Sequence, residues 1–235
     1  MAAILRFVLL TACLLMTLVA GKIKYKSCQH AHQNGHSEPG WFDIYSNATR
    51  PFKVWCEHSL NATGTLIQRR FGGTENFNRG YNDYKFGFGH PTTEYWIGLN
   101  NIYHLSNTGN SILYITLQDF NGDTRYAQYN HFVLGPEATG FKLNIYGFSG
   151  NVPDDMSYQN GMPFATQDKP DYHKCAINMR AGWWYNYCAY AMLNGLYYHT
   201  GKYKPSGGFY DGIYWKDWLG YDYSLRFTSM VLYHV

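Results

Sequence analysis

The chain has 235 residues, of which 15% are charged and 19% are aromatic, including 23 Tyr. This composition excludes a disordered chain, which is poor in aromatic residues and rich in charge. The formal charge of +3 is too small to indicate a nucleic-acid partner on electrostatic grounds. The 24 Gly and the many Tyr residues indicate a turn-rich chain that favours β-structure.

The first 21 residues have the layout of a secretory signal peptide. Arg6 precedes an apolar run, and Val19 and Gly21 occupy positions −3 and −1 of a cleavage site before Lys22. The alternative is a membrane anchor, but the run of about 14 residues is shorter than the roughly 20 of a spanning helix. We therefore predict a signal peptide at 1–21, a secreted, extracellular domain at 22–235 and no membrane span.

The cysteines fit this extracellular prediction. Cys13 is removed with the signal peptide, and the even number that remains predicts two disulfides. Three pairings are open, and sequence separation favours Cys28–Cys56 and Cys175–Cys188. None of these cysteines forms a C-x-x-C pair, so zinc binding is not expected.

Two N-glycosylation motifs also fit a secreted protein. They begin at Asn47 and Asn61, each followed by Ala and Thr. Each motif predicts an exposed loop position that carries a glycan.

Strand-like runs dominate the rest of the chain, whereas helical candidates are short. Helices are predicted from Asn76 onward and at residues 125–132, and few regular runs occur at residues 147–223. A long irregular region within a domain is usually functional or held by a ligand or disulfide, and the last two cysteines lie inside it. The predicted strands cover residues 51–56, 65–69, 95–99, 112–117, 141–145 and 225–233.

A series of motifs, in order along the chain, resembles the fibrinogen-related domain family, and in kind its ficolin and tachylectin-type secreted lectins. The resemblance implies one α+β domain with an N-terminal disulfide subdomain, a central antiparallel sheet with short helices, and a loop-rich C-terminal subdomain. The motifs are Cys28, GWFDIY at 40–45, FKVWC at 52–56, QRRFGG at 68–73 with Asn76-Phe77, YKFGFG at 84–89, EYWIGL at 94–99, FATQD at 164–168, CA at 175–176, AGWWYNYC at 181–188, LNG at 193–195 and GIYW at 212–215.

The resemblance also implies a calcium site in the loop before Cys175. Calcium binds six to eight oxygen atoms, which here would include the carboxylates of Asp168 and Asp171. The loop is shorter than the family pattern, and Lys169 and Lys174 place positive charge beside any cation. Two hypotheses stay open: a weak or remodelled calcium site, and a metal-free loop. No other cofactor is expected.

A ligand pocket is the second implied site. The related lectins hold acetyl groups in an aromatic cup beside a cis peptide, here Tyr187–Cys188, whose backbone N–H is directed at a carbonyl oxygen. Carried over by position, the predicted ligand-binding residues are Met179, Tyr187, Cys188, Phe209, Tyr210 and Tyr221.

The pocket departs from the lectin pattern at two positions. Met179 replaces a frequent aromatic residue, and Ala189 replaces a frequent His, so specificity is altered or binding is lost. Fibrin-type binding of a peptide amine is not expected, because Met179 and Tyr210 stand where acidic residues would be. We predict that the Trp183-Trp184-Tyr185 run belongs to the core, since Trp is usually highly buried.

The sequence indicates recognition and not catalysis. It contains no G-x-S-x-G, H-E-x-x-H or G-x-x-x-x-G-K-[ST] motif. The leading hypothesis is a lectin-like protein that binds acetylated or microbial glycans in innate defence. The alternative is a non-lectin module that binds a protein partner in matrix or signalling. A homo-oligomer, if formed, would assemble through the globular surface itself or through another chain.

Overall fold

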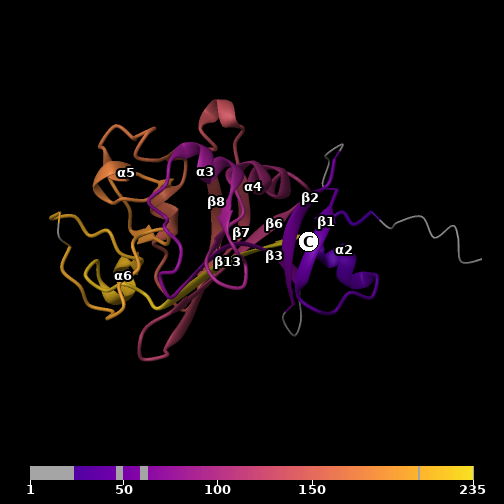
Figure 1. Ribbon diagram of the computed structural model, residues 1–235, viewed down its shortest axis with the longest axis horizontal. Helices are drawn as coiled ribbons and strands as arrows, with labels where there is room; N and C mark the ends of the chain where they lie inside the picture. Colours follow the sequence, from indigo (N-terminus) through magenta and orange to yellow (C-terminus); the bar gives the residue numbers. More distant parts are fainter. Residues whose placement is uncertain (1–23, 46–49, 59–62, 206, 235) are drawn as a thin grey trace, which may run out of the picture.

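The computed structural model describes residues 24–45, 50–58, 63–205 and 207–234. The predicted signal peptide and the predicted glycosylation sites Asn47 and Asn61 lie outside the described residues. Figure 1 shows three parts side by side: an N-terminal subdomain in indigo, a central sheet, and a C-terminal subdomain in orange and yellow. Among the described residues, no helix has the length and apolar character needed to span a membrane.

The N-terminal subdomain is a hairpin joined to a short helix. Helix α2 (Cys28–Gln33) begins after Ser27, whose side chain accepts a hydrogen bond from a backbone N–H of the first turn. Strands β1 (Gly40–Ile44) and β2 (Phe52–His58) pair in antiparallel fashion. The Cys28–Cys56 disulfide joins α2 to β2 with the two Cα atoms 5.4 Å apart, which confirms the first predicted pairing.

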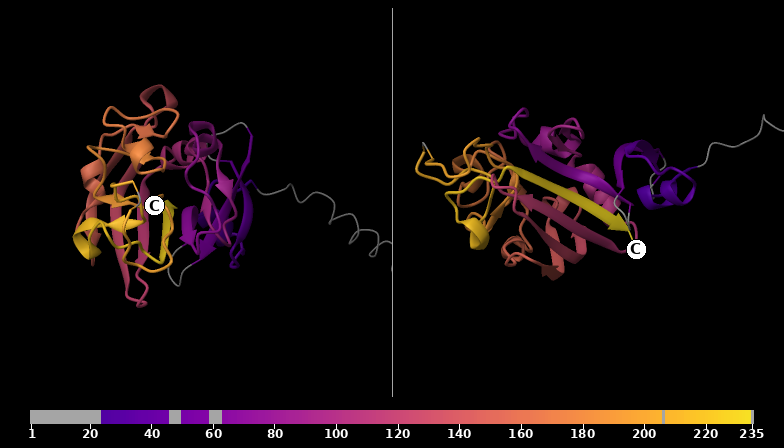
Figure 2. Two further views of the ribbon diagram at one scale, coloured as in Figure 1. Left: turned by 60° about the vertical axis from the view of Figure 1, so that its left-hand side comes forward. Right: turned by 90° about the horizontal axis from the view of Figure 1, so that it is seen from below.

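The central sheet places the last strand of the chain in its middle, so its strand order is β1-β2-β3-β13-β6-β7-β8. Figure 2 shows β13 running from the C-terminal subdomain back toward the N-terminal one. In β6 every second residue is buried, as expected for a sheet with one face on the core. The strands after β2 are β3 (Thr63–Phe71), β6 (Ser111–Gln118), β7 (Thr124–Leu134), β8 (Leu143–Gly150) and β13 (Phe227–His234), with the short β4 (Phe88–Gly89) and β5 (Tyr95–Trp96) paired beside β3.

Two predicted elements differ from the structure. Residues 125–132, predicted as a helix, lie in β7, which pairs with both β6 and β8 and buries Ala127 and Tyr129 on one face. The strand predicted at 95–99 ends at Trp96, because Gly98 has a φ of 101° and turns the chain into helix α4 (Leu99–Ser106). The helix predicted from Asn76 onward begins only at Tyr81, as α3 (Tyr81–Phe86), with Gly80 at its N-cap.

The C-terminal subdomain consists mostly of loops, as predicted. Side-chain amides pin these loops: Gln68 donates to the Leu193 carbonyl at 2.8 Å, and Asn194 donates to the Gly182 carbonyl at 3.0 Å. Trp183 and Trp184 are fully buried, which confirms that they belong to the core. The short elements are η1 (Glu137–Thr139), η2 (Met156–Gln159), β9 (Phe164–Ala165), α5 (Cys175–Asn178), β10 (Trp183–Trp184), β11 (Ala191–Met192), β12 (Tyr214–Trp215) and α6 (Lys216–Leu219).

Candidate binding site

The Cys175–Cys188 disulfide closes a loop. Backbone hydrogen bonds to a carboxylate hold one end of it, and residues with positive φ form the other. The Cα atoms of the two cysteines lie 5.2 Å apart, which confirms the second predicted pairing. At one end, the Asp171 carboxylate accepts hydrogen bonds from the backbone N–H groups of His173, Cys175 and Ala176 at 2.9–3.0 Å. At the other end, Tyr187 and Cys188 have φ values of 45° and 57°, and the Tyr187 side chain is 74% exposed.

All six predicted ligand-binding residues line one pocket beside this disulfide. The cavity measures about 170 Å³. Tyr210 stacks on Tyr221 with ring centroids 5.8 Å apart, and Tyr221 meets the buried Tyr214 edge-on at 5.2 Å. Ligand binding here stays a prediction, but the structure brings the residues together. The lining consists of Met179, Tyr187, Cys188, Ala189, Gly208, Phe209, Tyr210, Tyr214 and Tyr221.

The peptide before the second cysteine differs from the expectation. None of the described peptide bonds is cis, so the Tyr187–Cys188 bond is trans. The two successive left-handed residues turn the chain there instead. The backbone N–H of Cys188 donates to Sγ of Cys175 at 3.0 Å, so it is already engaged within the disulfide. The N–H that was expected to contact an acetyl group is therefore not free for one.

The pocket wall is neutral at physiological pH. Burial raises the pKa of Tyr214 well above its usual value, and burial also raises the pKa of Tyr221. Both phenols therefore keep their protons, and the Tyr214 hydroxyl donates to the Ala189 carbonyl at 3.2 Å. The pocket offers aromatic faces and hydroxyl groups and is suited to an apolar side chain.

The loop expected to hold calcium uses its carboxylates for other contacts. Asp168 accepts hydrogen bonds from the Thr166 hydroxyl at 2.6 Å and the Tyr81 N–H at 2.9 Å. Partial burial raises the pKa of Asp168, but these hydrogen bonds together outweigh it and hold that pKa below its usual value. Lys169 places its Nζ 3.9 Å from the Tyr81 ring centroid.

These contacts engage both carboxylates that were expected to bind calcium. Asp168 accepts from an O–H and an N–H donor, and Asp171 accepts from backbone N–H donors. Among the described residues, no group of three or more His, Cys, Asp or Glu side chains could hold a metal ion. Whether the loop binds calcium stays a prediction.

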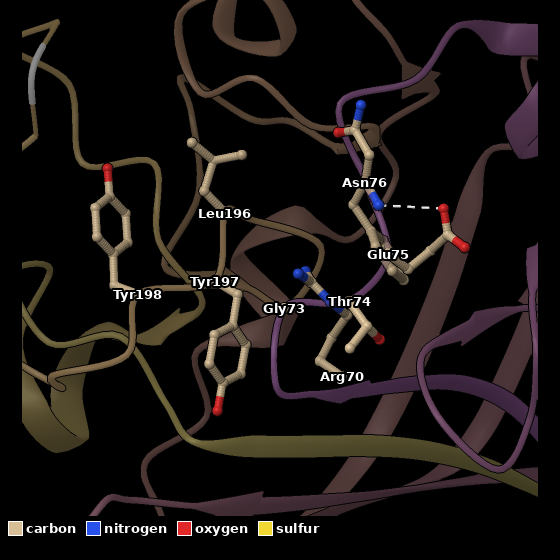
Figure 3. Close-up of a pocket in the computed structure, with 9 residues that line it drawn as sticks. Arg70, Gly73, Thr74, Glu75, Asn76, Leu196, Tyr197 and Tyr198 are labelled. Atoms are coloured by element: carbon tan, nitrogen blue, oxygen red, sulfur yellow. Dashed lines mark hydrogen bonds between the residues drawn. The ribbon is translucent and has the colours of Figure 1, made fainter.

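A second cavity lies where the loop after β3 meets the loop after β11. It measures about 420 Å³. Figure 3 shows Arg70 between Tyr197 on one side and Thr74 and Glu75 on the other. We call it the Arg70 cavity. Its lining consists of Arg70, Gly73, Thr74, Glu75, Asn76, Phe77, Leu196, Tyr197 and Tyr198.

Arg70, which lines this cavity, forms a buried ion pair with Glu94. Arg70 donates from Nε to Glu94 at 3.0 Å, and its guanidinium lies 3.9 Å from the Phe77 ring centroid. Glu94 also accepts from the backbone N–H groups of Phe71 and Glu75. None of the ligand-binding residues predicted from the sequence lines this cavity. The available signal was the paired arginines of the QRR motif, since a strand seldom buries an Arg without an acidic partner.

The fold and the two disulfides are those of a fibrinogen-like globe. Residues 24–234 match the family described as fibrinogen beta and gamma chains, C-terminal globular domain, and the chain belongs to that family.

Three curated relatives have related names. Human angiopoietin-related protein 6 is 37% identical over 212 residues, covering 88% of this chain and 44% of the relative. Bovine angiopoietin-related protein 1 is 43% identical over 213 residues, covering 88% and 43%. Human angiopoietin-4 is 40% identical over 224 residues, covering 92% and 43%. The chain thus spans less than half the length of these relatives.

Two solved structures share the fold. The fibrinogen-like globe domain of human ANGPTL2 superposes with a TM-score of 0.85 at 37% identity, covering 89% of this chain and 99% of that one. A lamprey fibrin D-dimer, complexed with the peptide Gly-His-Arg-Pro-amide, superposes with a TM-score of 0.86 at 30% identity, covering 99% and 85%.

Proposed function

We propose that this chain is an extracellular, non-enzymatic module that binds a protein partner through the aromatic pocket and its rim. The relatives support this hypothesis because they carry angiopoietin names and not lectin names. The two disulfides support an extracellular location, since such bonds persist in oxidising compartments. The alternative hypothesis from the sequence therefore has better support than the leading one.

The observation that carries the proposal is that three exposed aromatic side chains, those of Tyr187, Phe209 and Tyr210, line the pocket. Of ten large apolar residues exposed in the described part of the chain, five lie in the segment 172–210. Aromatic side chains that stand out from a surface beside a pocket are typical of protein interfaces, where they act as anchors. The five are Tyr172, Ile177, Tyr187, Phe209 and Tyr210.

The lectin hypothesis has weaker support. An aromatic cup would suit an acetyl methyl group, but the Cys188 N–H is engaged by Sγ of Cys175. Ala189 supplies no side-chain hydrogen bond where the lectins often have His. The pocket thus keeps the aromatic walls of a sugar-binding site without two of the polar groups that the lectin pattern supplies.

The test begins with a library of displayed extracellular protein domains from the source organism, screened with the purified chain. A partner recovered in this way is titrated against Phe209→Ala and Tyr210→Ala, with Tyr146→Ala in β8 as the exposed aromatic control. Loss of an interface anchor lowers affinity by roughly tenfold or more, and the control leaves it unchanged.

A glycan array measured in parallel separates the two hypotheses. Binding to the array that N-acetylglucosamine competes, with no protein partner in the library, would overturn the proposal in favour of a lectin. Protein binding that Phe209→Ala and Tyr210→Ala leave unchanged would place the partner elsewhere on the molecule and would also overturn it.

A further inference from the structure

A row of stacked tyrosines joins the aromatic pocket to the Arg70 cavity. Tyr198, which lines the Arg70 cavity, stacks on Tyr203 with ring centroids 4.0 Å apart. Tyr203 meets Tyr210, which lines the aromatic pocket, edge-on at 6.3 Å. The two cavities are therefore linked by two ring contacts through the buried Tyr203.

The ion pair of Arg180 and Asp211 lies beside this row, and its guanidinium is the group exposed to solvent. Arg180 donates from Nε to Oδ2 of Asp211 at 2.9 Å, and the Tyr198 hydroxyl donates to Oδ1 at 2.8 Å. The Asp211 side chain is only 3% exposed, whereas that of Arg180 is 40% exposed. The Asp211 carboxylate is covered and its oxygens accept hydrogen bonds within the cluster. The part of this ion pair that faces solvent is therefore the Arg180 guanidinium, which only donates.

The cluster adjoins both cavities through the chain itself. Arg180 follows Met179, and Asp211 follows Tyr210, so each partner of the ion pair is the neighbour of a pocket-lining residue. Tyr198, whose hydroxyl donates to Asp211, lines the Arg70 cavity.

Two further cations lie on the loop that connects the cavities. Lys202 and Lys204 are exposed and flank the buried Tyr203 of the row. Neither lysine has an ion pair among the described residues. The acids between the cavities are Asp211, which is covered, and Asp222, which is half-buried. Glu75, in the lining of the Arg70 cavity, is paired with Arg79. The stretch between the cavities therefore has an excess of exposed positive charge.

We infer that the docking surface continues from the aromatic pocket, across Arg180, to the Arg70 cavity, and that it takes an extended acidic segment of a protein partner. This inference rests on the proposed function and names the chemistry of its partner. An apolar side chain enters the aromatic pocket, and a carboxylate contacts Arg180 and the two lysines. An extended chain advances about 3.3–3.6 Å per residue, so a short peptide can cross two ring contacts.

The test uses a phage-displayed library of random linear peptides, selected on the purified chain. We expect the selected peptides to be enriched in Asp or Glu next to a large apolar residue, with affinity that falls as ionic strength rises. Synthetic copies are then titrated against Arg180→Gln, the double variant Lys202→Gln/Lys204→Gln, and Leu196→Ser in the Arg70 cavity. Loss of a charge-assisted hydrogen bond at Arg180 lowers affinity roughly tenfold or more.

Controls separate binding from folding and from the proposed function. Lys142→Gln removes an exposed cation that lines neither cavity, and it leaves peptide affinity unchanged. Arg180→Gln leaves the buried Asp211 carboxylate without its counter-ion and can therefore prevent folding. In that case the surface variant Lys202→Gln/Lys204→Gln provides the test. Phe209→Ala reports on the aromatic pocket alone.

Three outcomes would overturn the inference. One is a library without binders, and another is a set of binders without acidic enrichment. The third is a set of peptides that lose affinity with Phe209→Ala but respond neither to the lysine double variant nor to Leu196→Ser. In that third case the proposed function stands, and only the extended surface fails.

Discussion

Two consecutive arginines of β3 have different surroundings. Arg69 pairs with Glu57 near the surface, where both side chains keep some exposure. Arg70 is buried with Glu94, and burial lowers the pKa of Arg70 while Glu94 acts in the opposite direction. A buried charge that loses its partner is costly, whereas an exposed pair contributes little.

Replacement of Glu94 should therefore destabilise the domain strongly. We expect Glu94→Gln to lower the free energy of unfolding by about 3–5 kcal/mol, because it leaves the Arg70 charge buried without a counter-ion. The matched control, Glu57→Gln, should cost less, because both side chains of its pair keep contact with solvent. Denaturant unfolding measures both, and similar small losses for the two variants would contradict the assignment.

At the scale of elements, η2 is held to α6 by one buried carboxylate. Asp155, which precedes η2, accepts a hydrogen bond from the Asp217 N–H in α6 at 2.8 Å. Burial raises the pKa of Asp155 to about 7; the nearby Asp217 carboxylate adds to the increase, and the Asp217 N–H and Lys216 oppose it. Tyr221 of the aromatic pocket follows α6 by two residues, so this contact holds an element next to the pocket in the chain.

The raised pKa predicts a pH-dependent unfolding temperature. Folded Asp155 holds its proton up to about pH 7, whereas the unfolded residue loses it near 3.8. The stabilisation by the protonated form is therefore complete below about pH 4 and is lost as the pH rises to about 7. Asp155→Asn should remove this part of the slope, measured by calorimetry. Asp43→Asn, at a surface pair with Lys53, should keep the slope; an identical slope in all three proteins would refute the prediction.

The Cys175–Cys188 loop gives a second prediction at this scale. The double variant Cys175→Ala/Cys188→Ala should lower the free energy of unfolding by about 2–4 kcal/mol, since the open loop gains entropy when unfolded. It should also abolish binding at the aromatic pocket, because Tyr187 and Cys188 lose their placement. Cys28→Ala/Cys56→Ala is the control, which should cost stability and spare binding in the folded fraction. Equal binding by both variants would show that the bond does not shape the pocket.

At the scale of the whole molecule, the structure predicts stability without calcium. Asp168 and Asp171 already stabilise their loops through backbone N–H groups, so EDTA should leave the unfolding temperature and partner binding unchanged. A ligand that binds only the folded state raises the unfolding temperature as its concentration increases. A rise on titration with calcium chloride, reversed by Asp171→Asn, would show that the shortened loop binds the ion.

The sequence predicted most of the strands, but it failed where a pattern was ambiguous. Residues 125–132 carry aromatic and polar side chains that allow either a helix or a strand. Only the pairing of β7 with strands on both sides decided the matter, because such pairing depends on tertiary contacts. The order of the strands could not be predicted either, since the last strand, β13, pairs between β3 and β6, which are far from it in the sequence.

Local chemistry and ordered motifs determined the family, both cysteine pairings, the core tryptophans and the six residues of the aromatic pocket. These features were readable because each depends on residue type and on its position within a motif. Tertiary structure alone decided that the Cys188 N–H and the two loop carboxylates are already occupied. It alone joined Tyr198 to Tyr210 through Tyr203, because hydrogen-bond partners and ring contacts arise between segments whose meeting no local pattern records.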